Sequence, residues 1–193
     1  MYQENELKRV LNIKGPPVIR SLMESVCHED SEACSNTPNR WSDSMRELLA
    51  GYDMNPKLTR FAAETNDMVV KRRIKYYSLC RHHILPFFGH AYIAYIPDQW
   101  VLGLSKFSRV VEKYSRRLQI QETLTAEIAG CLIEALGTED VMVVLTGEHL
   151  CEKMRGAEND TEQSNMVTSS VHGVFRNKQE ARQEALSLMA PVD

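Results

Sequence analysis

Two clusters of cysteine and histidine, far apart along the chain, constrain the fold more than any other feature. The first has C-x-x-H spacing from Cys80 to His83, and the second has H-x-C spacing from His149 to Cys151. Residues two apart on a strand share a face, so the second cluster is predicted to present both side chains together. If the clusters meet, Cys80, His83 and Cys151 offer three ligands, the number that a catalytic zinc takes while its fourth position stays open.

Other cysteines and histidines receive a plainer interpretation. A lone C-x-x-H pair is weak evidence, because cysteine is often just a small core residue. His82 and His149 would be left to move protons beside a metal. Six further residues are interpreted as structural or without an arranged partner: Cys27, Cys34, Cys131, His28, His90 and His172.

Composition limits the class of protein. The chain has 193 residues, 43% of them hydrophobic and 25% charged, which suits one domain with a helical appendage. Its net charge of −3 argues against a nucleic-acid binder. The five cysteines form an odd set, which indicates a reducing, cytoplasmic compartment. We find no signal peptide, and no apolar run near the ~20 residues of a membrane helix.

Apolar periodicity and turn signals predict the secondary structure. The predicted helices cover residues 1–13, 18–26, 38–50 with Thr37 as N-cap, a segment capped by Ser105, 119–136 ended by Gly137, and 178–189. The predicted strands cover residues 67–79, 90–96, 101–104, 141–146 and 168–175, and residues 157–165 are a polar loop. This order predicts an α+β fold with two helices on one face of an antiparallel sheet. We expect an N-terminal helical region over 1–65 and a catalytic domain over 66–193.

A hydroxyl and two cations fall at a predicted helix N-terminus. Ser105, Lys106 and Arg109 stand where free backbone N–H groups and the helix dipole favour an anion. A solvated basic turn explains the same pattern. Arg155 adds a cation just beyond Cys151.

Gln121 and Glu122 open the helix predicted over 119–136. A carboxylate there can simply complement the helix dipole. It can also accept two hydrogen bonds from a flat edge such as N1–H and the 2-amino group of guanine. Both interpretations stay open.

Three segments, in this order, resemble GTP cyclohydrolase I: CRHHILPFFGHAYIAYIP, VLGLSKFSRVVEKYSRRLQIQETLT and EHLCEKMRG. The resemblance covers about residues 66–190, and TPNR at 37–40 is similar to the family's T-P-x-R. It implies the tunnelling fold, in which an antiparallel sheet backed by two helices is repeated around a ring. The family usually forms a homodecamer of two face-to-face pentamers, with active sites between subunits.

The resemblance also implies a reaction. Members convert GTP and water to 7,8-dihydroneopterin triphosphate and formate. It makes Cys80, His83 and Cys151 the ligands of Zn²⁺, which supplies hydroxide to attack guanine C8. Opening of the imidazole ring, deformylation and recyclisation follow.

Site roles carry over on the matching residues. His149 would protonate guanine N7, and His82 and Gln121 would position water and relay protons. Ser105 would lie near the ribose and phosphates, and Glu122 would anchor the guanine edge.

The phosphate contacts are implied in the same way. Lys106, Arg109 and Arg155 would hold the triphosphate, together with Arg40 from a neighbouring subunit.

Two departures from the family pattern bear on activity: Arg81, and a short, divergent N-terminal region in which Asp43 falls where some members carry a basic residue near the phosphates. The family commonly has C-E-H-H, whereas Arg81 stands here in place of glutamate. This reversal of charge beside two ligands leaves an alternative, a non-catalytic GTP-binding or regulatory ring subunit. A third interpretation is a tunnelling-fold nitrile reductase acting on a deazapurine, but such enzymes use a cysteine nucleophile and NADPH, and the three-ligand set argues against it.

Overall fold

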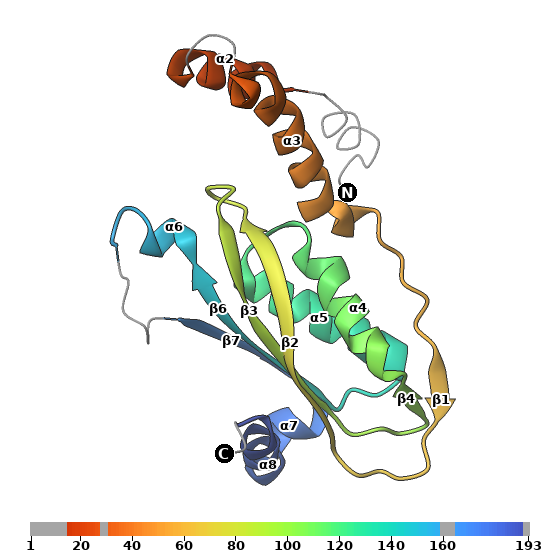
Figure 1. Ribbon diagram of the computed structural model, residues 1–193. Helices are drawn as coiled ribbons and strands as arrows, with labels where there is room; N and C mark the ends of the chain where they lie inside the picture. The colour runs from red at the N-terminus through yellow and green to blue at the C-terminus, as the bar shows by residue number, and fades with distance from the viewer. Residues whose placement is uncertain (1–14, 28–30, 159–164, 191–193) are drawn as a thin grey trace.

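The computed structural model describes residues 15–27, 31–158 and 165–190, which form an α+β fold (Figure 1). The helix predicted over 1–13 lies outside these residues. The helical elements are α2 (Pro17–Val26), α3 (Glu32–Leu48), η1 (Ala50–Tyr52), α4 (Leu104–Ser115), α5 (Gln121–Leu136), α6 (Leu150–Lys153), α7 (Gly173–Asn177) and α8 (Gln179–Met189). The strands are β1 (Arg60–Ala62), β2 (Val69–Cys80), β3 (Pro86–Tyr95), β4 (Trp100–Leu102), β5 (Leu118–Gln119), β6 (Val141–His149) and β7 (Met166–Val171).

The main sheet has the strand order β5-β2-β3-β6-β7. Its four longer strands are antiparallel, as predicted, but β5 runs parallel to β2, so the sheet is mixed. The prediction of a purely antiparallel sheet was wrong because Gln119 was assigned to the helix that follows and no strand was predicted at Leu118. Those two residues pair with Leu79 and Cys80 before α5 begins.

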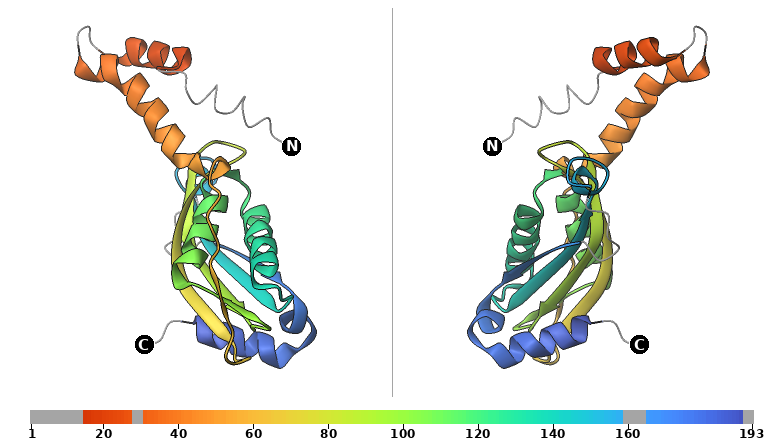
Figure 2. Two further views of the ribbon diagram at one scale, coloured as in Figure 1. Left: turned by 90° about the vertical axis from the view of Figure 1, so that its right-hand side faces the viewer. Right: turned by 90° about the vertical axis from the view of Figure 1, so that its left-hand side faces the viewer.

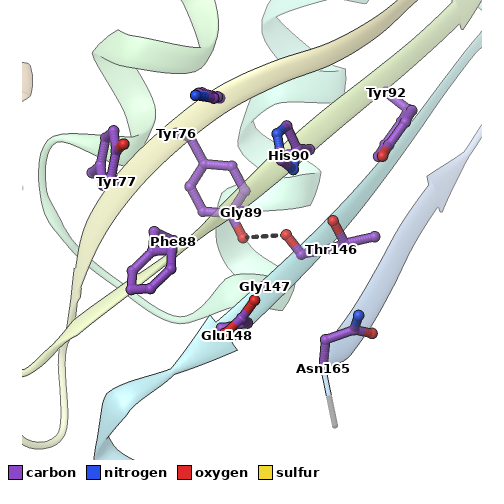
Figure 3. A pocket seen from close by; sticks show the side chains of 11 residues that line it. Tyr76, Tyr77, Phe88, Gly89, His90, Tyr92, Thr146, Gly147, Glu148 and Asn165 are labelled. Atoms are coloured by element: carbon purple, nitrogen blue, oxygen red, sulfur yellow. Dashed lines mark hydrogen bonds between the residues drawn. The ribbon is translucent and has the colours of Figure 1, made fainter. Parts of the chain in front are cut away.

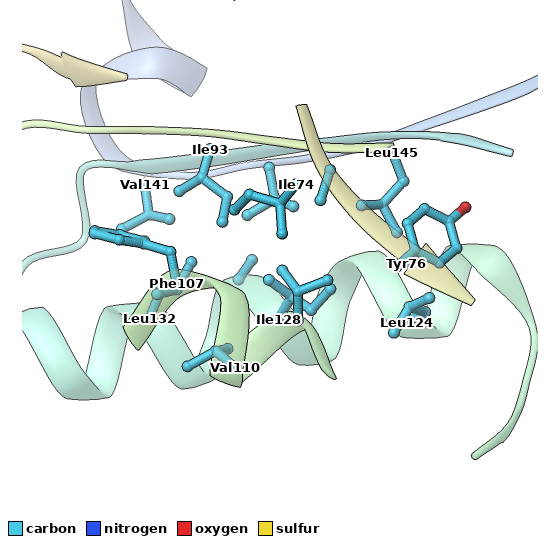
Figure 4. Packing of buried hydrophobic residues seen from close by; sticks show 14 of the residues in the cluster. Ile74, Tyr76, Ile93, Phe107, Val110, Leu124, Ile128, Leu132, Val141 and Leu145 are labelled. Carbon is cyan, nitrogen blue, oxygen red and sulfur yellow. The ribbon is translucent and has the colours of Figure 1, made fainter. Parts of the chain in front are cut away.

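Helices α4 and α5 cover one face of this sheet (Figure 2). Every fourth residue of α5 faces the strands, and Leu124, Ile128 and Leu132 are fully buried there, as their spacing predicted. Figure 4 shows these side chains packed against strand residues such as Ile93 and Leu145. Burial of each side chain of this size contributes roughly 1.5–3 kcal/mol to folding.

Helices α7 and α8 pack at one end of the opposite face. Phe175 and Ala185 are fully buried against Ala94 and Met142 of the sheet. The strand predicted over 168–175 therefore ends early, at Val171. Gly173 has a positive φ of 51°, which stops the extended chain, and α7 begins there.

Helix α3 begins earlier than its sequence suggested. Ser31 is the N-cap, since its side chain accepts a hydrogen bond from the backbone N–H of Cys34 at 3.2 Å. The prediction that Thr37 caps a helix starting at Pro38 was wrong, and Pro38 lies inside α3. The polar residues before Pro38 belong to this helix, where most of their side chains are exposed.

Helix α4 also begins one residue before its predicted cap. Gly103 is the N-cap and Ser105 lies in the first turn, so Ser105 was wrongly assigned as the cap. The backbone N–H of Gly103 bonds to the carbonyl of Thr59, which continues the β1–β4 pairing up to the helix. Ser105 and Lys106 still lie at the helix N-terminus, where unpaired N–H groups favour an anion.

Strand β1 lies within the region that we expected to be only helical. Its residues pair antiparallel with β4, across the boundary expected at residue 65. Within 15–27, 31–158 and 165–190, no helix has both the length and the apolar character to cross a bilayer.

Candidate metal centre and proton-transfer site

A tight turn after β2 presents the first cysteine–histidine cluster. The backbone N–H of Cys80 bonds to the carbonyl of Leu85, and the N–H of Ile84 bonds to the carbonyl of Cys80, both at 2.8 Å. Ile84 has a positive φ of 55°, unusual for a β-branched residue, which closes the turn. As a result Cys80 is buried at the end of the strand while His83 is exposed.

Cys151 approaches this turn from a helix. Strand β6 ends at His149, and Cys151 lies in the short helix α6. The prediction that both residues extend from one strand face was wrong, because the chain begins to coil at Leu150. The half-buried Cys151 nevertheless reaches Cys80 and His83, and the donor atoms of the three residues lie within 4.8 Å of one another.

This donor set fits zinc. Thiolate and imidazole are the ligands that zinc prefers, and three of them leave a coordination position for water. Burial raises the pKa of the Cys151 thiol, and the adjacent Cys80 raises it further. A bound cation would favour the thiolate form of both cysteines.

His149 lies between an aromatic ring and a buried amide. Its ring stacks on Phe87, its partner in the β3–β6 register, with centroids 4.4 Å apart and planes at 7°. Its Nε2 lies 2.9 Å from Oε1 of Gln121. Burial lowers the pKa of His149, although Glu152 and Glu122 act in the opposite direction.

The amide of Gln121 has a defined orientation. Gln121 is fully buried, and its Nε2 lies 3.3 Å from the carbonyl oxygen of Leu145 and 3.0 Å from that of Met166. Carbonyl oxygens only accept hydrogen bonds, so the amide nitrogen must face them and Oε1 must face His149. His149 therefore donates its Nε2–H to Gln121, and its Nδ1 is the nitrogen left to accept or pass a proton.

His82 is exposed beside the same sulfur. Its Nδ1 lies 3.9 Å from Sγ of Cys80, the distance at which Nδ1 of His83 also lies. The two imidazole rings meet edge to face, with centroids 6.2 Å apart. His82 thus borders the metal centre from the solvent side.

Two more predicted residues act on this site electrostatically. Glu122, exposed in the first turn of α5, raises the pKa of His149. Arg155 beyond α6 lowers the pKa of Cys151. The structure therefore gathers Cys80, His82, His83, Gln121, Glu122, His149, Cys151 and Arg155 at one end of the sheet.

The predicted phosphate-binding residues do not join them within one chain. Helix α4 ends just before β5, which pairs with Cys80, so its C-terminal end lies near the metal centre. Ser105 and Lys106 are in the first turn at its other end, about 15 Å along the axis from Ser115, and Arg109 lies midway, about 9 Å from Ser115. Figure 1 shows this end of α4 beside β4, away from the β2–β3 turn.

Arg40 is also remote from the metal centre in the single chain. It lies on α3, which projects from the sheet and its helices (Figure 1). Its exposed guanidinium forms an ion pair with Glu32.

A pocket of about 380 Å³ lies on the sheet face that α4 and α5 do not cover (Figure 3). Phe88, His90 and Glu148 line it, from β3 and β6. Because side chains alternate along a strand, Glu148 faces this pocket while its neighbour His149 faces Phe87. The sheet therefore separates the pocket from the His149 ring.

Three residues of the His149 environment were missed in the sequence. Phe87 forms the stack, and Thr125 and Thr168 bond to one another beside Gln121. The spacing of Thr125 from Gln121, one helical turn, was a usable signal. Thr168 had none, because it comes from a strand far along the chain.

Comparison with known proteins gives a consistent result. The sequence model of the GTP cyclohydrolase I family matches residues 17–190. A relative from Hyperthermus butylicus named GTP cyclohydrolase 1 is 43% identical over 174 residues, which cover 90% of this chain and 88% of the relative. Proteins of the same name from Pseudoalteromonas atlantica and Campylobacter jejuni are 44% and 40% identical over 175 and 176 residues. These two alignments cover 88% and 89% of this chain, and 94% and 92% of the relatives.

Among solved structures, the archaeosine synthase QueF-Like in the apo form is 18% identical in sequence. The match covers 61% of this chain and 96% of the chain in that structure. Its TM-score is 0.38, a likeness too low to support an argument.

Proposed function

Because the chain belongs to the GTP cyclohydrolase I family of hydrolases, we propose that it converts GTP and water to 7,8-dihydroneopterin triphosphate and formate. The observation that carries this proposal is the convergence of Cys80, His83 and Cys151 within 4.8 Å, next to His149. Proton transfer and a cation site are both needed to open the guanine imidazole ring.

The metal is proposed to be Zn²⁺, held by the two sulfurs and the His83 imidazole. When bound, zinc lowers the pKa of a coordinated water to about 7 and so provides a nucleophile for guanine C8 near neutral pH. Burial of Cys80 excludes solvent from one side of this position, and the exposure of His83 leaves the other side accessible to substrate.

His149 is proposed to protonate guanine N7, which makes C8 more electrophilic. Its Nε2–H is bound to Gln121, so Nδ1 is the nitrogen that would carry the proton to the base. Stacking on Phe87 holds the ring plane, and this preorganisation avoids an entropic cost during the reaction. The buried amide of Gln121 is better suited to orienting His149 than to holding water directly.

His82 is proposed to relay protons to water during ring opening, deformylation and recyclisation. Its exposed imidazole and its position beside Cys80 suit this role. General acid–base catalysis by a positioned imidazole typically contributes 10²–10⁴-fold.

Glu122 is proposed to bind the guanine edge. Its carboxylate is exposed in the first turn of α5, directly after Gln121, and is close enough to His149 to affect its pKa. Two N–H groups of guanine, N1–H and the 2-amino group, match the two oxygens of a carboxylate.

The triphosphate is proposed to lie between subunits. Arg155 lies at the metal centre, but Ser105 and Lys106 are at the far end of α4 and Arg109 is in the middle of this helix. A ring of copies, with Arg40 also contributed by a neighbour, would bring one chain's cations to another chain's metal centre. We therefore propose a tunnelling-fold homodecamer with inter-subunit active sites; a cytoplasmic location remains a prediction from the cysteine count.

Turnover of purified protein tests this function directly. With GTP and Zn²⁺, we expect equimolar release of formate and of a pteridine that fluoresces after oxidation. Protein that contains zinc and binds GTP without forming either product would contradict the proposal.

The alternative, a non-catalytic GTP-binding ring subunit, is favoured only by Arg81, which is exposed between Cys80 and His82. It predicts GTP binding without turnover, and activity in the Arg81→Glu variant. Turnover by the unaltered chain would exclude it.

A further inference from the structure

We propose that Thr168 and Thr125 are positioning residues that fix the Gln121 amide and, through it, the ring of His149. This inference rests on the proposed function, in which His149 delivers a proton. Neither threonine belongs to the metal centre or to the residues that carry charge toward the substrate.

A chain of short contacts links the two hydroxyls to the amide. Nε2 of Gln121 lies 3.2 Å from Oγ1 of Thr168, and the hydroxyls of Thr168 and Thr125 lie 2.7 Å apart. The Thr125 hydroxyl donates to the backbone carbonyl of Gln121 at 2.7 Å. The contacts thus begin and end on one residue.

The number of hydrogens that each group carries gives a direction to every hydrogen bond in this series. A hydroxyl has one hydrogen, and that of Thr125 is used on the Gln121 carbonyl. Thr168 must then donate to Thr125, which leaves the Thr168 oxygen to accept from the Gln121 amide. The amide nitrogen has two hydrogens for three acceptors, so one hydrogen is shared between two of them. Both hydroxyls donate and accept, so each fixes the other.

The surroundings leave the amide few alternatives. Gln121 and Thr125 are 0% and 1% exposed, so no solvent competes for these bonds. Met166 and Thr168 both come from β7, whereas Leu145 comes from β6. The amide is therefore held by two adjacent strands and by its own helix, and only Oε1 faces His149.

Without the Thr168 hydroxyl, the Gln121 amide would keep its hydrogen bonds to the two backbone carbonyls but lose its hydrogen bond to Thr168. The two carbonyls would still prevent the amide from flipping, but the amide could rock about its last torsion, and the bond from His149 Nε2–H to Oε1 would lengthen. The neutral ring would then spend part of its time as the Nδ1–H tautomer, in which Nδ1 cannot accept the proton that it is proposed to pass to the substrate. This predicts slower chemistry with unchanged substrate binding.

Three variants test the inference in the full-length protein. Thr168→Val keeps shape and removes the hydroxyl, Thr168→Ser keeps the hydroxyl, and Ser169→Val changes the next residue, whose side chain is exposed. We expect Thr168→Val to lower kcat about threefold to tenfold, the range for loss of one buried hydrogen bond, with KM for GTP unchanged. Thr168→Ser and Ser169→Val should match the unaltered protein.

A measurement without substrate separates this inference from the proposed function. NMR of protein carrying ¹⁵N-labelled histidine, at about pH 8 and above the ordinary histidine pKa near 6.5, reports the tautomer of each imidazole. His149, identified by its absence in a His149→Gln variant, should be protonated on Nε2 in the unaltered protein and Thr168→Ser. In Thr168→Val its signal should shift toward a mixture of tautomers.

The inference is overturned if His149 in Thr168→Val keeps the Nε2–H tautomer of the unaltered protein, whatever the activity. An equal fall in kcat for Thr168→Ser and Thr168→Val would also overturn it, because the loss would then come from packing. A protein that shows the tautomer change without turning over GTP would support the positioning role and refute the proposed function.

Discussion

At the scale of single residues, exposure separates the side chains that build the site from those that meet the substrate. Cys80 and Gln121 are buried, which suits the roles proposed for them, to hold a metal and a neighbouring ring. His82, His83 and Glu122 are exposed at the same end of the sheet. Replacement of a buried member should therefore affect metal content or ring position, and replacement of an exposed member should affect substrate.

Removal of one sulfur tests the metal centre. Cys151→Ser should abolish stoichiometric zinc and reduce turnover by more than about 100-fold, since even outer-shell changes cost 10- to 100-fold. Cys151 is only half-buried, so the variant should fold. Elemental analysis alongside the formate assay checks this, with Cys131→Ser on α5 as the control. A Cys151→Ser protein that retains zinc at one ion per chain would contradict the assignment.

Replacement of Glu122 tests base recognition. Glu122→Gln should reduce kcat/KM for GTP about 10- to 100-fold, because hydrogen bonds to a charged group are worth roughly 1.5–3 kcal/mol. The unaltered protein should reject inosine triphosphate, which lacks the 2-amino group, and the variant should discriminate much less. Equal discrimination by both proteins would remove Glu122 from the guanine site.

At the scale of elements, helix α5 and strand β6 were predicted correctly because their apolar pattern in the sequence is strong. Helix α5 keeps its apolar residues on one face and ends at Gly137, whose φ of 68° is the left-handed conformation that glycine readily adopts. Strand β6 was predicted from its run of β-branched residues, although it continues to His149. Both elements bury their apolar residues, so local pattern and tertiary packing agree.

Several elements were mistaken because their ends depend on distant partners. Strand β5 exists because Leu118 and Gln119 pair with β2, and β7 ends where Val174 donates its N–H to Asp140. The position of Cys151 depends on coiling that begins at Leu150. Sequence spacing brought Cys80, His83 and Cys151 together, as the structure does, but could not reveal the helix that carries Cys151. Their role as zinc ligands remains a prediction.

Truncation in the core measures the contribution of α5. Ile128 is fully buried between this helix and the sheet, so Ile128→Ala should lower the free energy of unfolding by about 2–5 kcal/mol. Val18→Ala on α2, where the side chain is 71% exposed, should change it by less than about 0.5 kcal/mol. Denaturant titrations at one fixed chain concentration make the comparison, because assembly adds to apparent stability. Equal effects would show that α5 does not stabilise the fold as its burial indicates.

At the scale of the whole molecule, a single chain separates the two halves of the proposed site. The residues proposed as metal ligands and proton carriers gather beside the β2–β3 turn, whereas Lys106, proposed to bind phosphate, lies at the other end of α4. A heterologous contact, repeated around a closed ring, can join one half from each copy. In the proposed ring, activity would be a property of the assembly.

Hybrid rings test this arrangement. Cys151→Ser lacks the metal half and Lys106→Ala lacks part of the phosphate half, so each should be nearly inactive alone. Coexpressed in equal amounts, they should recover activity at about one quarter of the sites, where two intact halves meet by chance. Cys151→Ser coexpressed with Cys80→Ser should recover none, because both changes fall in the same half. Absence of recovery in the first pair would place all the groups in one chain.

The pairing of β3 with β6 has a consequence for the order of events during synthesis. A nascent chain that has emerged from the ribosome only through β3 holds Cys80 and His83, but its third donor has not been translated. Only when β6 joins β3, with His149 opposite Phe87, does Cys151 arrive beside the first two. If these three residues hold zinc as proposed, the complete set of ligands forms only after this strand pair closes, and a chain stalled on the ribosome between the two strands would hold only two of the three.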